Sequence, residues 1–186
     1  MRNILLVISG PSGVGKGTLK ERLLASGENV VESVSCTTRK PRTGEKDGVN
    51  YFFVSEREFR SRIEENDFLE YDEHFGKFYG TPRSFVERTL KDKSVILEID
   101  VVGGLNAKRL MPESTVLVMI VPPSMDELKR RLKGRGSESE EEIKNRLVRV
   151  QYEMEQEHLY DYVIVNDNFD EAYDKLKEIY HTEINK

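Results

Sequence analysis

A glycine-rich segment between an apolar run and a helical segment constrains the fold of this chain more than any other feature. Residues 10–16 read Gly-Pro-Ser-Gly-Val-Gly-Lys and follow the continuously apolar residues 4–8. Glycines let the backbone curl until its N–H groups converge, and the new helix and Lys16 add positive charge. The pattern G-x-x-x-x-G-K therefore predicts a loop that binds the phosphates of a nucleoside triphosphate, against the weaker alternative of a plain glycine turn.

The residue after Lys16 departs from this pattern. Phosphate loops of this kind place Ser or Thr there to reach Mg²⁺, whereas this chain has Gly17 and then Thr18. Mononucleotide kinases often carry this Gly-Lys-Gly-Thr form, so the departure favours them over GTPase-like switches. We expect Lys16 to be catalytic, and a direct contact of Thr18 with the metal stays open. The expected ATP-binding residues are Gly10, Pro11, Ser12, Gly13, Val14, Gly15, Lys16, Gly17 and Thr18.

The hydrophobic pattern around this loop predicts an α/β fold. Continuous apolar runs are typical of parallel strands covered on both faces. They occur at residues 4–8, 95–99, 116–121 and 162–165, and residues 30–35 are expected to join them. Helical patterns lie between and after them, at about 102–111, 124–133, 140–158 and 170–181. This alternation implies right-handed crossovers, and so a parallel sheet core flanked by helices, of the P-loop NTPase type.

Two stretches interrupt the alternation. Residues 36–81 contain a short β-like piece, turn signals and one helix at about 56–66, so they are interpreted as an inserted subdomain. The second stretch begins with the glycine-flanked, charged residues 134–139, where Ser139 and Glu142 form a capping-box pattern. The prediction is one domain with a core of residues 1–35, 82–133 and 146–186, the insertion at 36–81, and a mobile lid at 134–145.

A series of ordered motifs gives the chain a more specific resemblance. The run Thr-Thr-Arg-Lys-Pro-Arg-Thr-Gly-Glu at residues 37–45 resembles the acceptor-binding region of guanylate kinases. Further similar motifs stand at residues 48–53, 68–70, 75–81, 97–100, 134–136 and 165–167. Since the matches run in order from about residue 4 to residue 180, coincidence is implausible. The resemblance implies that the insertion binds the acceptor nucleotide.

The acceptor phosphate is expected to lie against two arginines of this region. Arg39 and Arg42 are three residues apart with a stiffening proline between them. Two guanidinium groups can hold one phosphate through several charge-assisted hydrogen bonds, and Tyr51 and Tyr79 can add hydroxyl donors. A solvated basic turn is the plain alternative.

The resemblance places Ser35, Glu70 and Thr81 against the base, beside Gly80. A carboxylate suits guanine, because guanine presents adjacent N1–H and N2–H₂ donors, and a hydroxyl such as that of Thr81 can donate to O6. A surface acid is the plain alternative for Glu70. Glu98 stands where the family often has Asp, so whether Glu98 or Asp100 lies closer to the nucleotide or to metal-bound water stays open.

The segment at residues 129–136 resembles the lid that closes over ATP in this family. Arg135 lies between two glycines, and Arg146 lies on the following helix beside an apolar stripe, from which it could point into a cleft. Phosphoryl transfer needs cations around the moving group. Arg135 and Arg146 are therefore expected to be catalytic, against the alternative of a solvated helix end.

Composition excludes several other functions. Lysine plus arginine is 29 and aspartate plus glutamate is 34, a net charge of −5, which disfavours a nucleic-acid binder. A single cysteine, Cys36, excludes an intramolecular disulfide and fits a reducing cytoplasm. The first apolar run is too short for a signal peptide or a membrane span. No obligate protein partner is evident.

The expected reaction is ATP + GMP giving ADP + GDP, with Mg²⁺ and without a covalent enzyme intermediate; dGMP stays open as a further acceptor. A kinase for another monophosphate is disfavoured by the Glu70 pairing with guanine. A protein-interaction module derived from this fold is disfavoured by the intact phosphate loop.

Overall fold

The computed structural model describes residues 1–74, 76–133 and 140–186, and the side chains of residues 132–146 lie outside the description. Within these residues, the centre is a five-stranded parallel sheet in the order β2-β7-β1-β8-β9. Its strands are β1 (Leu5–Ser9), β2 (Val30–Glu32), β7 (Ser94–Glu98), β8 (Thr115–Val121) and β9 (Tyr162–Val165). The predicted parallel sheet is therefore confirmed.

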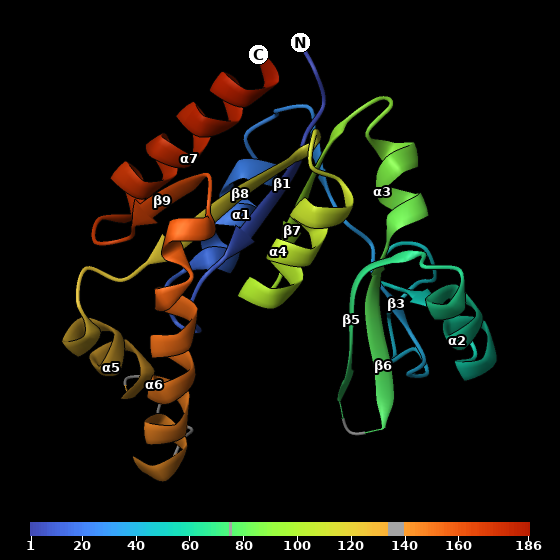
Figure 1. The fold of residues 1–186 in the computed structure, drawn as a ribbon, viewed down its shortest axis with the longest axis horizontal. Coiled ribbons are helices and arrows are strands. Elements are labelled where there is room, and N and C mark those ends of the chain that lie inside the picture. The colour runs from blue at the N-terminus through green and yellow to red at the C-terminus, as the bar shows by residue number, and fades with distance from the viewer. Residues whose placement is uncertain (75, 134–139) are drawn as a thin grey trace.

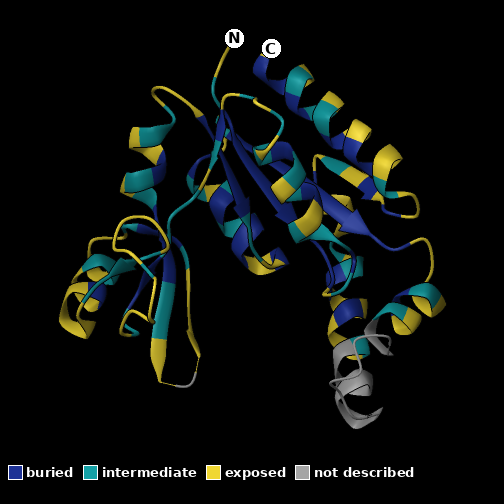
Figure 2. Ribbon diagram, turned by 180° about the vertical axis from the view of Figure 1, so that it is seen from behind, coloured by how far each residue is buried: buried dark blue, intermediate teal, exposed yellow. Residues whose placement is uncertain are grey.

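Alternate side chains of the central strand enter two cores, one on each face of the sheet. Leu6 and Ile8 pack with α1 (Lys16–Leu24), α6 (Glu140–Glu155) and α7 (Phe169–Ile184). Leu5 and Val7 pack with α3 (Arg83–Thr89) and α4 (Val101–Leu110). Figure 2 shows the middle of the sheet as buried and the outer faces of the helices as exposed. Burial on both faces is the reason that the three inner strands, β1, β7 and β8, are continuously apolar.

A second sheet is built from the segment between β2 and α3. It has the order β4-β3-β6-β5. Its strands are β3 (Cys36–Thr37), β4 (Phe52–Phe53), β5 (Phe68–His74) and β6 (Lys77–Pro82). The helix α2 (Glu56–Glu64) covers it, with Phe59 stacked between Phe68 and Phe78 at centroid distances of 4.4 and 5.3 Å. The residues of this small core all lie within 36–81, the bounds predicted for the insertion. The predicted boundary after residue 81 falls one residue inside β6.

The helices α5 (Met125–Lys133) and α6 lie on the opposite side of the central sheet from this second sheet (Figure 1). The short helix η1 (Glu157–Leu159) leads from α6 into β9. Among the described residues, no helix is long and apolar enough to cross a bilayer.

Several local expectations differ from the structure. The strand expected at residues 30–35 ends at Glu32, and the helix expected at 140–158 ends at Glu155. The hairpin β5–β6 and the helix α3 escaped sequence analysis. The outer half of β5 is exposed, so cross-strand pairing with β6 holds it rather than burial, and it carries no apolar period to detect.

Candidate active site

The glycine-rich loop joins the carboxyl end of β1 to the first turn of α1. Gly10, Gly13 and Gly15 have φ angles of 137°, 90° and 93°, a region that side chains rarely adopt. A Cβ atom at Gly10 would also lie 2.1 Å from the carbonyl oxygen of Ile120 on β8. The curled conformation and the close contact with the sheet therefore both require glycine.

Two side chains hold the shape of this loop. The Nζ of Lys16 donates hydrogen bonds to the carbonyl oxygens of Gly10 (2.6 Å) and Pro11 (3.0 Å), so the ammonium group lies within the loop. The buried Nδ2 of Asn166, just after β9, donates to the Val14 carbonyl oxygen at 2.7 Å. Asn166 belongs to a motif that the sequence resemblance includes without assigning it a role. The structure shows that it supports the loop.

A cavity of about 670 Å³ opens beside the loop. Glycines of the loop line it together with Lys16, Thr18, Glu98 and Asp100, and α6 contributes Arg149, Val150 and Glu153. The carboxyl ends of β1 and β7 thus bring the predicted loop residues and both predicted acids to one place, as parallel strands do at a single sheet edge. Thr18 is exposed here, whereas Glu98 is partly buried.

Asp100 connects α4 with α6. Its Oδ1 accepts a hydrogen bond from the backbone N–H of Gly103 (2.8 Å) and so caps α4, while its Oδ2 accepts one from Arg149 Nη2 (3.1 Å). Arg149 also contacts Glu153 at 3.3 Å. Burial raises the pKa of the Glu153 carboxyl, while the charges of Arg149 and Lys16 act in the opposite direction.

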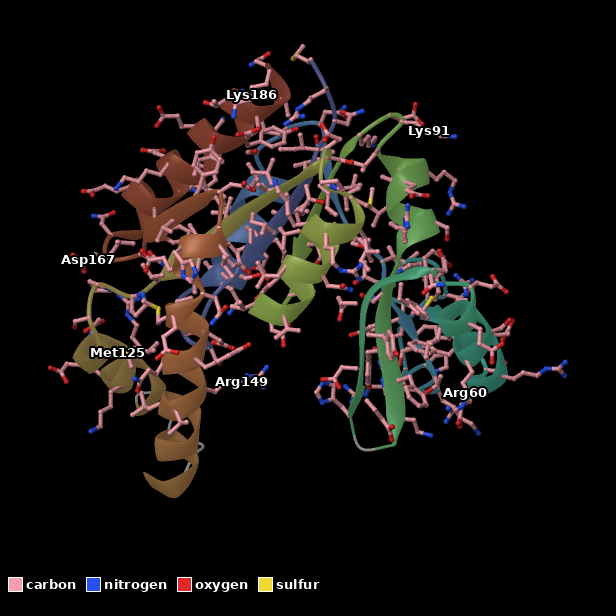
Figure 3. The ribbon with its side chains drawn as sticks, viewed as in Figure 1. Arg60, Lys91, Met125, Arg149, Asp167 and Lys186 are labelled. Atoms are coloured by element: carbon pink, nitrogen blue, oxygen red, sulfur yellow. The ribbon has the colours of Figure 1, made fainter. Side chains whose placement is uncertain are left out.

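Arg149 escaped sequence analysis, because only its spacing to Glu153 distinguishes it from other surface arginines of α6. In Figure 3 its side chain points away from α5 and toward the second sheet.

A second cavity, of about 840 Å³, lies between α4 and the hairpin β5–β6. It is lined by Glu70 and Tyr79 from the hairpin and by Gly103 and Asn106 from α4, among others. The two cavities share Ile99, Asp100 and Arg149 in their linings. They therefore adjoin, and two ligands could meet end to end at this shared wall.

Glu70 has a defined carboxylate orientation in the second cavity. Its Oε1 accepts a hydrogen bond from the fully buried Thr81 hydroxyl at 2.6 Å. Burial raises the pKa of the Glu70 carboxyl, and its hydrogen bonds with Thr81 partly oppose that shift. The Thr81 proton, expected to face O6 of a base, goes to Glu70 here. Gly103 lets α4 pack closely against Glu70, since a Cβ atom at Gly103 would lie 3.2 Å from the Glu70 side chain.

Arg39 is held by an ion pair at the outer part of the second sheet. Its Nη1 and Nη2 donate to Glu45 at 2.9 and 2.8 Å, and its guanidinium lies 5.5 Å from the Tyr51 ring centroid. Hydrogen bonds from Arg39 and from the backbone of Arg42 lower the pKa of Glu45 to about 2. The Tyr51 and Tyr79 rings are 6.1 Å apart, so three of the four predicted phosphate ligands are clustered.

The remaining predicted site residues do not line either of the two cavities in the described part of the chain. The Arg42 side chain is exposed. Ser35 lies just before β3, and its carbonyl oxygen accepts from the Phe52 backbone at 2.9 Å. Gly80 is buried in β6, where a Cβ atom would lie 2.9 Å from Phe68 and Tyr71. Arg135 and the side chain of Arg146 lie outside the described residues, so their catalytic roles stay predictions, as does the lid at 134–145.

Comparisons with known proteins find similarity along nearly the whole chain. A family model described as guanylate kinase matches residues 2–183. The guanylate kinase of Clostridium perfringens (strain SM101 / Type A) is 48% identical over 179 residues, which cover 96% of this chain and 82% of that protein. A crystal structure of guanylate kinase from Anaplasma phagocytophilum matches with a TM-score of 0.71 at 36% identity, covering 100% of this chain and 88% of that one.

A more distant structure supports the fold alone. Shikimate kinase from Bacteroides thetaiotaomicron matches with a TM-score of 0.53 at 13% identity, covering 96% of this chain and 98% of that one.

Proposed function

The chain belongs to the guanylate kinase family, and from this premise we propose that it transfers the γ-phosphoryl group of ATP to GMP by direct in-line displacement. The observation that carries the proposal is the pair of adjoining cavities. The glycine-rich loop lines one and Glu70 lines the other, and both include Ile99, Asp100 and Arg149. Two nucleotides whose phosphates meet at this shared wall would bring donor and acceptor together.

In this mechanism the protein contributes positioning and charge. The loop amides and Lys16 hold the ATP phosphates. The Glu70 carboxylate, oriented by Thr81, accepts from N1–H and N2–H₂ of guanine. Arg39, Arg42, Tyr51 and Tyr79 hold the GMP phosphate, which requires Arg39 to exchange part of its contact with Glu45 for the ligand. The same contacts are available to dGMP, because they address the base and the phosphate.

Magnesium fits the oxygen-rich wall of the first cavity. Glu98, Asp100 and Thr18 offer carboxylate and hydroxyl oxygens beside Lys16, the ligand type that Mg²⁺ prefers. When bound, the ion neutralises charge on the transferring phosphates. Glu98 and Asp100 would hold it directly or through water, with Thr18 at the rim.

Closure completes the proposed cycle. Arg135 and Arg146 would approach the transferring group when residues 134–145 close over ATP, and closure would exclude water as a competing acceptor.

A coupled ADP-release assay across AMP, GMP, CMP, UMP and dTMP tests the proposal. We expect kcat/KM for GMP to exceed that for every other nucleotide by about 10⁴-fold. A wrong base would leave buried polar groups of the site unpaired, and such a site rejects that ligand strongly. Comparable turnover with AMP would refute the guanine assignment. Lys16→Met supplies the background rate of contaminating kinases.

A further inference from the structure

The absence of a side chain at Gly17 leaves a space that Glu98 approaches. A Cβ atom at Gly17 would lie 3.5 Å from Oε2 of Glu98 and 4.0 Å from Oε1. Phosphate loops with the pattern G-x-x-x-x-G-K-[ST] carry a hydroxyl side chain at this position and direct it to Mg²⁺. In this chain a carboxylate from the end of β7 stands next to the place of that hydroxyl.

Lys20, one helical turn after Lys16, holds this carboxylate. Its Nζ lies 3.2 Å from Glu98 Oε2 and 2.5 Å from Glu32 Oε1. The Lys20 side chain is only 14% exposed, so its charge is largely withdrawn from water and depends on these two acids. Glu32 ends β2 and Glu98 ends the neighbouring β7, so the ammonium group bridges two strand ends at the sheet edge that carries the loop.

This arrangement restricts where Glu98 can point. The contact from Lys20 goes to Oε2, the carboxylate oxygen nearer to Gly17, and so holds the carboxylate beside the cavity that Lys16, Gly17 and Thr18 also line. Glu98 is one methylene longer than an aspartate. Without Lys20, its side chain would have rotamers that turn the carboxylate away from the loop, and populating these rotamers would lower the metal affinity.

We propose that Lys20 is a positioning residue for phosphoryl transfer: it fixes Glu98 so that its carboxylate replaces the hydroxyl missing at Gly17 on the metal side of the ATP phosphates. The inference rests on the proposed function, because it presumes that Mg²⁺·ATP occupies this cavity. The competing explanation is that Lys20 only cross-links α1, β2 and β7. That explanation predicts lower thermal stability with unchanged metal affinity.

The test measures Mn²⁺ affinity by electron paramagnetic resonance for the full-length protein saturated with a non-hydrolysable ATP analogue. Lys20→Met should raise the Mn²⁺ Kd about 10-fold, the low end of the effect of removing a partner that orients a metal ligand. Lys20→Arg should stay within about threefold of wild type, since it keeps the charge and most of the reach. Lys177→Met is the matched control, because Lys177 on α7 also pairs with an acid, Glu28 before β2, and neither residue lines the cavity beside the loop.

Gly17→Ser provides the decisive second variant. Its Cβ fits at ordinary contact distance from Glu98, and its hydroxyl restores the missing ligand. In the Gly17→Ser background, Lys20→Met should therefore raise the Kd less than about threefold, below the cost of removing an orienting partner. The inference is overturned if Lys20→Met alters the Mn²⁺ Kd less than twofold while lowering the Tm. It is also overturned if Lys20→Met raises the Kd as much in the Gly17→Ser background as in the wild type. Failure of the proposed function would instead appear in the wild type, as absent GMP turnover.

Discussion

Replacing Glu70 with glutamine tests the guanine assignment directly. The amide keeps the size of the carboxylate but removes its charge and replaces one acceptor oxygen with a donor. Thr81 donates to Glu70 Oε1 at 2.6 Å and would continue to favour the amide oxygen on that side. The NH₂ group would then face the N1–H and N2–H₂ donors of guanine.

The geometry sets the size of the expected effect. Hydrogen bonds to a charged partner contribute about 1.5–3 kcal/mol each. Losing the charge and one of the two acceptors should cost about 3 kcal/mol in GMP binding, or roughly 100-fold at ~1.4 kcal/mol per tenfold. The KM for ATP should change less than about threefold, because Glu70 lines only the second of the two cavities described.

Steady-state assays with GMP and IMP locate the lost contact. IMP lacks the 2-amino group, so wild type should prefer GMP and Glu70→Gln should lose most of that preference. Glu73→Gln is the matched control, since Glu73 is an exposed acid of the same strand. An equal rise in both KM values, or an unchanged GMP-to-IMP ratio, would refute the reasoning and give Glu70 a structural role.

The pH profile provides an independent check. Burial raises the pKa of Glu70 above its ordinary value of 4.5, and the protonated acid cannot accept from both guanine donors. On acidification, kcat/KM for GMP should therefore fall with a midpoint above that value, as kcat/KM reports groups of the free enzyme. Glu70→Gln should lack this limb, whereas titration of the GMP phosphate affects both proteins alike.

Three further predictions concern the phosphates. Lys16→Met should lower kcat at least 10²-fold, about the effect of losing one preorganised charge donor, with little change in Tm; near-normal kcat would remove the loop from the mechanism. Glu45→Gln should raise the KM for GMP about tenfold, because Arg39 loses the two-point partner that orients its guanidinium group; an unchanged KM would show that Arg39 acts without Glu45. Arg135→Ala and Arg146→Ala should lower kcat by about 10³–10⁵ with small changes in nucleotide Kd, and losses below about fivefold for both would exclude them from the chemistry.

Sequence alone was sufficient for the central sheet and insufficient for the second one. Strands β1, β7 and β8 are buried on both faces and so carry unbroken apolar runs, which can be detected without knowing their neighbours. The edge strand β9 also carries such a run, although Val163 and Val165 are exposed. The hairpin β5–β6 is stabilised by pairing and by the Phe59 stack of a small core, and such tertiary contacts leave no period in the sequence. The capping box of Ser55 and Glu58 that starts α2 is, by contrast, a local signal that the sequence carries.

Site residues show the same division. The loop, Glu70, Thr81 and Arg39 lie in recognisable motifs, so sequence predicted them. Arg149 and Lys20 gain meaning only from the acids they meet, Asp100 for one and Glu32 with Glu98 for the other. In the sequence, charged residues that pair across distant segments cannot be distinguished from ordinary surface residues, because only the fold brings them together.

The junction between β7 and α4 determines how the two halves of the site meet. Asp100 caps α4 and lines both cavities, and three residues later Gly103 lets α4 pack against Glu70. Asn106, one turn further on, donates to the Leu69 carbonyl oxygen and ties α4 to β5. One strand end and one helix therefore set the position of the Glu70 carboxylate, which we propose binds guanine, relative to the phosphate loop. A side chain at Gly103 would displace the Glu70 carboxylate, because its Cβ would crowd the Glu70 side chain at 3.2 Å while the hydrogen bond from the Gly103 backbone to Asp100 holds the start of α4 in place.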